Sequence, residues 1–516
     1  MRAVNSAPGK IAQIEKPLTI QVFTKGGTGR HRVRPEVPEQ MKKTVKYFRN
    51  LLLILLFFAV LPCAYGNPTE IRILHVNDSH GFAEPYQPLG SREPLGGIAY
   101  LALKANQLRR EKPTLLLAAG DMIQGNNWAN LSRGKSVVEI MNRMRFDVMV
   151  VGNHEFDFGQ EALVKRISEA SFPVLGANVK GVGGLEGYVI KELEGIKIAI
   201  IGVVTEDVPV STSPKNVSGL QFVPVHETVQ KYVTELKGKV DLILVLSHIG
   251  YYWDRRLAET VRGIDVIVGG HSHTKLDKPV QIGDTLIVQA WEHAKVLGVL
   301  DLTVQDKRVR EWDGHLEEIS PRLGAEDPEV KAFVEEHSRE VERLMGARIG
   351  ETEVDLDGEN VRKRETNLGD LVADIIREAS GADLAIINGG GIRTSIKKGE
   401  IRIMDIYSVL PFDNYVVAIK LTGRQIREAL EHGVSGVEEN EGRFPQVSGI
   451  TFTYSPSAPK GSRVKEIRVQ GRPVDPDGQY RVATNDFMAA GGDGYRAFGE
   501  AMRSSKDFEV VGGMMK

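Results

Sequence analysis

Side chains that could bind a metal ion follow five apolar segments between residues 71 and 273. We expect each segment to be a strand that ends in a polar group: Ile71–Val76 in Asn77-Asp78-Ser79-His80, Thr114–Ala119 in Gly120-Asp121, Phe146–Val151 in Gly152-Asn153-His154-Glu155, Val240–Leu246 in Ser247-His248, and Ile264–Val268 in Gly269-Gly270-His271-Ser272-His273. Ligands of α/β sheets gather at the carboxyl ends of strands. We therefore expect the five groups to converge on one crevice.

The types of these residues indicate which metals such a site would take. Carboxylate, imidazole and amide oxygen together suit borderline or hard divalent ions such as Zn, Mn or Fe. A carboxylate shared between two ions about 3.5–4 Å apart gives an arrangement that serves in-line phosphoryl displacement. Glycines beside the groups permit tight turns that aim the side chains inward. The pattern predicts two divalent metal ions and phosphoryl chemistry.

Each group also has an ordinary structural interpretation. A single Gly-Asp pair is usually a turn, and His248 after an apolar strand could be a hydrogen-bonded core histidine. The Asp-x-His, Gly-Asn-His-Glu and Gly-His-x-His groups are more specific. Their order along one segment of alternating strands and helices favours the metal site over five separate coincidences.

The elements that must position these residues form an α/β pattern. Helical periodicity in 98–110 and 136–144 alternates with the expected strands from Thr69 to about Ile319, and a charged helix is expected over 327–345. A second α/β region begins near Gly350, with helices near 368–379 and 422–432 and a strand over 383–387. A chain of 516 residues is too long for one core, so two domains are expected.

Composition excludes several classes of function. Residues 1–66 carry 11 basic and 3 acidic residues, which leaves 55 basic and 65 acidic residues in the remainder. Such an acidic body is a poor binder of nucleic-acid polymers, because their affinity rests on neutralising many phosphates. The single cysteine, Cys63, precedes this body, which therefore has neither a thiol nucleophile nor disulfides.

The N-terminal region has the form of an export signal. Residues 41–66 begin with basic residues, continue with an apolar run of about a dozen residues and end in small residues, as secretory signal peptides do. The run is shorter than the roughly 20 residues that a membrane span needs. An uncleaved N-terminal anchor is the alternative interpretation, and it is the one membrane contact that we expect. We interpret residues 1–40 as the result of a start codon assigned too far upstream.

These motifs resemble a known family. NDSHG, GD, GNHEFD, SH and GGHSH resemble the calcineurin-like metallophosphoesterases, specifically the exported 5′-nucleotidase and UDP-sugar hydrolase branch, and NGGGIR, LPFDN and TNDFMAAGGDGY resemble its C-terminal domain. The resemblance implies a two-layered α/β sandwich domain and a smaller α/β nucleotide-binding domain joined by a helix. We assign residues 67–322 to the first, 323–349 to the linker helix and 350–516 to the second.

The resemblance implies roles for individual residues. One metal would be held by Asp78, His80, Asp121 and His273, and the other by Asp121, Asn153, His248 and His271. His273 is a mild departure, because family members often carry Gln or Asn there. His154 would stabilise the transition state of in-line hydroxide attack on phosphorus, with Asp157 as its orienting partner; Glu155 is the less certain residue of its motif.

The C-terminal motifs imply a nucleotide site. Phe412 and Phe487 resemble an aromatic pair that sandwiches the base, and Asp493 resembles a residue that holds the ribose hydroxyls. The remaining expected substrate contacts are Arg364, Asn388, Gly390 and Arg393. Since phosphate and base sites fall on different domains, the family implication is a domain rotation near the linker helix.

Three functions are compatible with these features. The first is release of phosphate from nucleoside 5′-monophosphates, with di- and triphosphates or nucleotide sugars as further substrates, by an enzyme exported to the periplasm, the cell surface or the medium. The second keeps the fold but acts on 2′,3′-cyclic and 3′-nucleotides. The third is a catalytically silent, secreted binding protein. The filled ligand positions and the LPFDN and AAGGDGY segments favour the first.

Overall fold

A computed structural model of the chain describes residues 40, 43, 67–504 and 509–515. Residues 66–516 form one compact unit, and the expected signal peptide at 41–66 lies outside the described residues apart from Lys43. None of the described helices is both long enough and apolar enough to span a bilayer.

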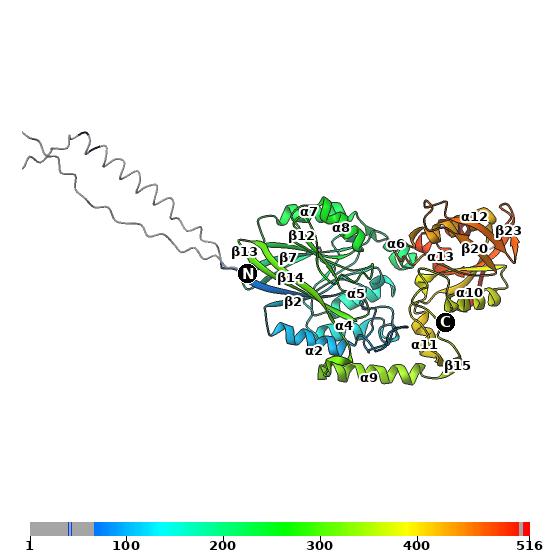
Figure 1. Ribbon diagram of the computed structural model, residues 1–516, viewed down its shortest axis with the longest axis horizontal. Coiled ribbons are helices and arrows are strands. Elements are labelled where there is room, and N and C mark those ends of the chain that lie inside the picture. Colours follow the sequence, from blue (N-terminus) through cyan, green and yellow to red (C-terminus); the bar gives the residue numbers. More distant parts are fainter. Residues whose placement is uncertain (1–39, 41–42, 44–66, 505–508, 516) are drawn as a thin grey trace, which may run out of the picture. The chain divides into compact units, whose positions relative to one another are not determined.

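The N-terminal region contains two six-stranded sheets (Figure 1). The first has the order β14 (Arg308–Glu318), β13 (Val296–Gln305), β1 (Thr69–Val76), β2 (Thr114–Ala118), β3 (Val148–Val150) and β4 (Val174–Leu175). The second has the order β11 (Val280–Ile282), β12 (Thr285–Gln289), β10 (Val266–Gly269), β9 (Leu242–His248), β7 (Ile196–Val204) and β6 (Tyr188–Leu193).

The two sheets share one core. A single cluster of buried side chains joins β1 and β2 of the first sheet to β7, β9 and β10 of the second, and includes Ile73, Leu117, Ile200, Leu246 and Val268. Helices cover the outer faces: α2 (Ile98–Arg109) and α4 (Lys135–Arg143) pack on the first sheet, and α7 (Val225–Leu236) and α8 (Tyr251–Thr260) on the second. The central strands are apolar on both sides because both faces are covered.

Parallel pairing aligns the ends of the central strands. β1 and β2 pair in parallel with Val76 opposite Ala118, β3 continues the parallel set, and β9 pairs in parallel with both β7 and β10. The carboxyl ends of β1, β2 and β3 therefore share one edge of the first sheet, and those of β9 and β10 share one edge of the second. All five strands predicted from the sequence are present, although β3 is shorter and β9 extends to include His248.

A long helix leads to the C-terminal region. α9 (Pro328–Met345) begins at Asp327, whose carboxylate accepts hydrogen bonds from the backbone N–H groups of Glu329 and Val330. Such caps satisfy N–H groups that have no partner within the helix. Val330 and Phe333 bury one face of α9 against the first domain.

The C-terminal region is a second α/β unit. Its five-stranded sheet has the order β19 (Pro445–Ser448), β16 (Leu384–Asn388), β23 (Gln479–Asn485), β18 (Tyr415–Thr422) and β24 (Glu509–Met514). α10 (Asn367–Ser380) packs in one buried cluster, while α12 (Gly423–Gly433) and α14 (Arg496–Ser504) pack in another. A small sheet of β20 (Ile450–Tyr454), β21 (Val464–Val469) and β22 (Arg472–Pro473) completes it. The predicted pair of α/β domains is confirmed.

Candidate metal centre and substrate cavity

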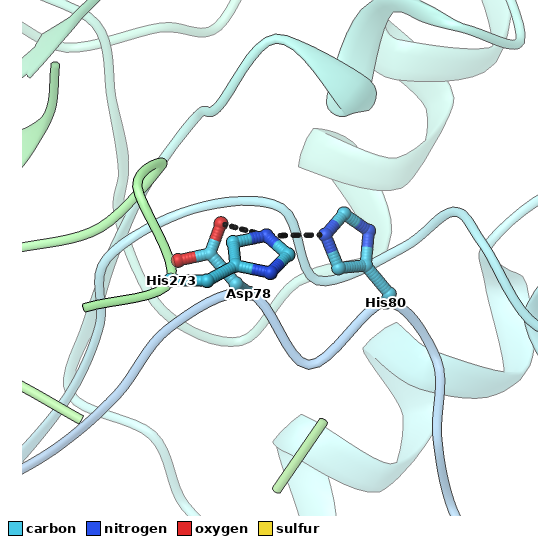
Figure 2. A group of neighbouring side chains, drawn as sticks. All are labelled: Asp78, His80 and His273. Carbon is cyan, nitrogen blue, oxygen red and sulfur yellow. Dashed lines mark hydrogen bonds and ion pairs between the residues drawn. The ribbon is translucent and has the colours of Figure 1, made fainter. Parts of the chain in front are cut away.

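The ends of four strands, β1, β2, β9 and β10, bring two groups of potential metal ligands together. Asp78, His80 and His273 form the first group (Figure 2), and Asp121, His248 and His271 form the second. Within each group the ligand atoms lie within 4.8 Å of one another. All six residues were predicted from the sequence, and the edges of both sheets contribute to each group.

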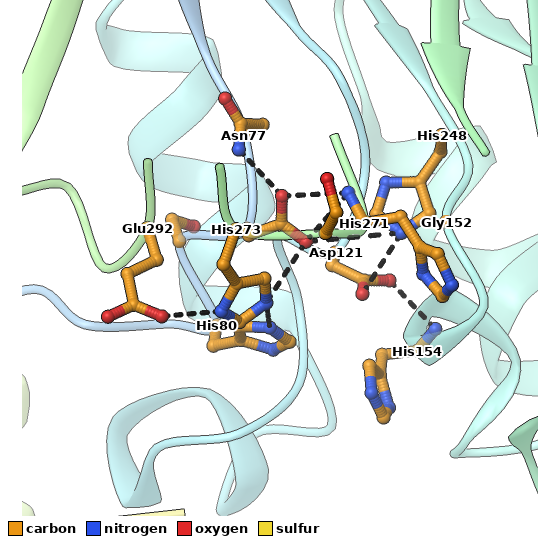
Figure 3. A network of polar contacts seen from close by, with 12 residues as sticks. Asn77, His80, Asp121, Gly152, His154, His248, His271, His273 and Glu292 are labelled. Atoms are coloured by element: carbon orange, nitrogen blue, oxygen red, sulfur yellow. Dashed lines mark hydrogen bonds and ion pairs between the residues drawn. The ribbon is translucent and has the colours of Figure 1, made fainter. Parts of the chain in front are cut away.

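Short distances also connect the two groups (Figure 3). His248 Nε2 lies 3.1 Å from Asp121 Oδ2 and 4.0 Å from Asp78 Oδ1. In the first group, His273 Nε2 lies 3.3 Å from Asp78 Oδ1 and 3.2 Å from His80 Nε2. Asp78 Oδ1 therefore lies near a histidine of each group, and Asp121 lies beside His248 in the second group.

The site fits divalent cations. Asn153 is 2% exposed and its side-chain oxygen has no hydrogen-bond partner. Buried polar atoms are rarely left without partners, so this oxygen is available to a cation. The donors are carboxylate, imidazole and amide groups, which suit Zn, Mn or Fe.

The protonation of the histidines supports the same interpretation. Burial lowers the pKa of His80 well below its usual range and that of His271 to about 3, so both rings are neutral, the form in which imidazole binds a metal. Burial also opposes protonation of His248, but the carboxylates of Asp121 and Asp78 raise its pKa to about 10. A proton there occupies the position at which a ligand nitrogen would meet a cation.

The backbone at the site is held in a conformation that residues with side chains seldom adopt. Five candidate ligands have positive φ angles: Asp78 at 49°, His80 at 48°, Asp121 at 53°, His271 at 75° and His273 at 50°. The left-handed region costs a non-glycine residue about 1–3 kcal/mol and is found at functional sites. The turns that aim these side chains inward are therefore strained.

The carboxylate of Glu155 links two of these turns through hydrogen bonds. Its carboxylate is 1% exposed and accepts backbone N–H groups from Asp121, Met122 and Ile123 at 2.8, 2.7 and 3.2 Å and from Gly152 at 2.5 Å. Burial and the charge of Asp121 raise the pKa of Glu155 to about 7, and the N–H groups oppose that rise. Glu155 therefore positions Asp121 and Asn153 and does not face the crevice.

His154 lies beside the ligand groups with an oriented ring. Its Nδ1 is 2.6 Å from Asp157 Oδ2, and its backbone N–H donates to Asp121 Oδ1 at 2.9 Å. Burial disfavours the charged ring, but Asp157 and Asp121 raise the pKa of His154 above its ordinary value. Thr212 donates a hydrogen bond to Asp157 and fixes that carboxylate; nothing in the sequence indicated this contact.

One cavity of about 1560 Å³ joins the ligand groups to the C-terminal domain. Its lining includes Asp121, Asn153, His154, His271 and His273 together with Asn388, Gly390, Arg393, Phe412, Phe487 and Asp493. Arg393 Nη2 lies 3.0 Å from His80 Nε2, and the Phe412 ring stacks on His154 at 5.7 Å between centroids. Residues predicted for phosphate and base therefore face one space.

The expected arginine at 364 lies elsewhere. Arg364 has a 61% exposed side chain that pairs with Asp357 at 2.7 Å, and it does not line the cavity. Arg362, two residues earlier, does line the cavity, and its charge lowers the pKa of Arg393 to about 10 together with the larger effect of burial. Arg364 therefore pairs with Asp357 outside the cavity, while Arg362 lines it.

The predicted ribose and base contacts are braced by their neighbours. Asn388 Nδ2 donates to Asp493 Oδ2 at 2.6 Å, and Asn485 Nδ2 donates to Asn388 Oδ1 at 3.1 Å. A side chain at Gly390 would come within 2.8 Å of the Gly442 backbone, so this approach requires glycine.

Four further residues line the cavity and were not predicted from the sequence, because no motif marks them: Tyr251, Tyr252, Trp253 and Arg443.

Comparisons with known proteins agree with this geometry. The calcineurin-like phosphoesterase family matches residues 71–275, and the 5′-nucleotidase C-terminal domain family matches residues 348–500. The chain is 32% identical to the snake venom 5′-nucleotidase of Crotalus adamanteus, over 89% of this chain and 88% of that protein. It is 34% identical over 87% of its length to the trifunctional nucleotide phosphoesterase protein YfkN of Bacillus subtilis, but spans only 34% of that protein.

A solved structure extends the likeness to three dimensions. The 5′-nucleotidase precursor of Thermus thermophilus matches with a TM-score of 0.80 and 36% identity, over 86% of this chain and 94% of that one. The match covers both domains of this chain. The chain belongs to the 5′-nucleotidase family of metal-dependent phosphoester hydrolases.

Proposed function

We propose that this protein releases phosphate from nucleoside 5′-monophosphates at a site completed by two divalent metal ions. The observation that carries the proposal is one cavity that members of both ligand groups and His154 line together with Phe412, Phe487 and Asp493. Phosphate chemistry and base recognition are then joined in one space. We assign residues 67–322 to the metal-binding domain, 323–349 to the linker and 350–516 to the nucleotide-binding domain.

The proposed roles follow from the contacts. Asp78, His80, Asp121 and His273 would hold one ion, and Asp121, Asn153, His248 and His271 the other; when bound, the ions supply Lewis-acid stabilisation of the phosphoryl oxygens. Asp157 engages His154 Nδ1, which leaves Nε2 to donate to the phosphoryl group as negative charge develops. Arg393, which lies 3.0 Å from His80, and Arg362 add positive charge from the C-terminal domain.

The C-terminal wall would recognise the nucleoside. Phe412 and Phe487 would stack on the base, a contact worth about 1–3 kcal/mol and tolerant of base identity. Asp493, held by Asn388, would accept hydrogen bonds from the ribose hydroxyls. The leaving nucleoside is thereby retained while phosphate is released at the metal end.

The size of the cavity supports a wider substrate range. Its volume of about 1560 Å³ exceeds the roughly 300–1,000 Å³ typical of small-molecule sites. Tyr252 and Trp253, each 58% exposed, line the cavity on the metal-binding domain. We include nucleoside di- and triphosphates and nucleotide sugars among the proposed substrates.

The proposed setting is outside the cytoplasm. The expected signal peptide over residues 41–66 is the basis, and membership of a family with snake venom representatives supports export. Fractionation of cells expressing the full chain, followed by N-terminal sequencing of the exported protein, tests it. A mature protein beginning near Asn67 is expected, and an intact leader in the cytoplasm would contradict the proposal.

Side-by-side assays test the activity. Phosphate release by the purified protein is measured with Mn²⁺ or Zn²⁺ on 5′-AMP and 3′-AMP directly, and on 2′,3′-cyclic AMP and UDP-glucose after a coupled phosphatase step. We expect 5′-AMP to be the best of the monophosphates and EDTA to abolish its hydrolysis. Preference for 3′-AMP or the cyclic nucleotide would replace the proposal with the second function, and inactivity on every substrate with metals bound would favour a binding protein.

A further inference from the structure

His273 is bound on both sides of its ring. Its Nε2 faces Asp78 and His80 at 3.3 and 3.2 Å, while its Nδ1 lies 2.5 Å from Glu292 Oε2 (Figure 3). A carboxylate at Nδ1 fixes the tautomer that leaves Nε2 free as a ligand atom. In metal sites such a partner also orients the ring and raises its basicity.

Glu292 is itself immobilised by a buried cation. Its other oxygen lies 2.7 Å from the Nζ of Lys295, a residue only 2% exposed. The ammonium group lies over the rings of Trp291 at 4.3 Å and Tyr86 at 5.4 Å. Both contacts stabilise a cation away from water, so the carboxylate has a permanent partner on the side opposite His273.

The segment that carries Glu292 is tied to the loop after β1. Asn77 donates to the carbonyl of Trp291 at 2.6 Å and accepts the N–H of Ala290 at 2.7 Å, and the N–H of His293 donates to the carbonyl of Asp78 at 2.8 Å. Trp291, His293 and Ala294 all have positive φ, between 53° and 55°. Strain of this kind persists only where surrounding contacts determine the conformation.

The hydroxyl of Tyr86 adds another support. It lies 2.8 Å from His293 Nδ1, and the Phe82 ring stacks on His293 at 4.0 Å between centroids. Phe82 and Tyr86 follow His80 in the chain, so the first ligand group and the Glu292 segment are held together on two sides.

We propose that Glu292, held by Lys295, is a positioning residue that presents His273 as a nitrogen ligand, so that the first metal site selects a nitrogen-preferring ion such as Zn²⁺ over Mn²⁺. The proposal rests on the proposed function for the assignment of Asp78, His80 and His273 to that site. Imidazole ligands favour Zn, Fe and Ni, whereas carboxylate and carbonyl oxygens favour Mg and Mn. An oriented imidazole therefore shifts the preference of the site.

The test measures metal binding by the full-length protein without nucleotide. Metal-stripped wild-type, Glu292→Gln and His273→Gln proteins are titrated with Zn²⁺ and with Mn²⁺ against a competing chromogenic chelator. We expect Glu292→Gln to weaken Zn²⁺ binding at one of two sites by about 10- to 100-fold, with a smaller effect on Mn²⁺. His273→Gln should reduce the Zn²⁺ preference at least as far.

A double variant separates positioning from a structural role. If Glu292 acts through His273, adding Glu292→Gln to His273→Gln changes Zn²⁺ affinity little further, because coupled residues are not additive. Full additivity, or unchanged Zn²⁺ affinity in Glu292→Gln, would overturn the proposal. Glu317 lies on β14 and pairs with Lys104 of α2 at 3.0 Å, so Glu317→Gln is the matched control and should bind both metals normally.

A further variant guards against misfolding. Glu292→Gln alone leaves the ammonium of Lys295 buried without its carboxylate, which is destabilising. Glu292→Gln combined with Lys295→Met removes both charges, and the loss of Zn²⁺ affinity should persist with a melting temperature of the metal-free protein close to wild type. Recovery of Zn²⁺ affinity in this variant would overturn the proposal. Absence of 5′-AMP hydrolysis with normal metal binding would instead contradict only the proposed function.

Discussion

Replacing Glu155 by glutamine tests whether one buried carboxylate holds the two metal-binding turns together. Oε2 accepts the N–H groups of Asp121 and Gly152, and Oε1 accepts those of Met122 and Ile123. Glutamine keeps one oxygen and turns an NH₂ group toward the other two donors. Two buried N–H groups then lose their acceptor.

The expected loss follows from those two groups. A buried donor without a partner costs about 1–3 kcal/mol, so Glu155→Gln should lower the free energy of unfolding by about 2–6 kcal/mol. The assay is urea unfolding of the metal-free protein at pH 8, where the wild-type carboxylate is ionised. Hydrolysis of an aryl phosphate by the metal-loaded variant should also fall, because the Asp121 and Asn153 turns are no longer joined.

A surface carboxylate provides the control. Glu259 pairs with Arg256 at 3.1 Å on α8, with side chains 39% and 59% exposed, and its replacement by glutamine should change stability by less than about 1 kcal/mol. A Glu155→Gln protein as stable as this control, with normal activity, would refute the positioning role of Glu155.

Four further outcomes are expected. Arg362→Ala should lower kcat/KM for 5′-AMP by about 10- to 100-fold, as loss of a charged hydrogen bond does, while Arg364→Ala, measured in the same assay, should have little effect. His154→Asn should lower kcat by about 10²-fold with metal content intact by elemental analysis; collapse of metal content would contradict its role. Phe487→Ala should raise KM for 5′-AMP about 10-fold but spare an aryl phosphate. Burial raises the pKa of Asp265 to about 6, so the stability that its neutral form contributes is lost as pH rises from 4 to 6, and Asp265→Asn should melt progressively higher than wild type over that range.

The strands and ligand groups could be predicted because both are local signals. An apolar run that ends in Asp, Asn or His identifies a strand and the residues at its carboxyl end, as for Asp78 and Asp121. The division of these strands between two sheets could not be predicted, since it depends on pairing across long separations, such as β1 with β13. His248 was expected after its strand and lies within it, because β9 continues its pairing with β7 to that residue.

The supporting residues could not be predicted because their partners are far away in the sequence. Arg362 and Arg364 have the same chemistry and lie two positions apart, and only the pairing of Arg364 with Asp357 decides which one faces the cavity. Thr212 contacts Asp157 across 55 positions, and Glu292 contacts His273 from a segment without a recognisable motif. Such contacts follow from tertiary packing.

The left-handed backbone at five candidate ligands sets a limit on how far this protein can be stabilised. Glycine would relieve that strain, but His80 is 1% exposed and its Nδ1 lies 2.9 Å from the carbonyl oxygen of Gln124, so His80→Gly would remove buried contacts together with the ligand. The strain therefore persists at these positions, where the surrounding contacts determine the conformation and the side chains are the ligands. Stabilising substitutions that preserve catalysis belong elsewhere, in the helices that cover the outer faces of the sheets.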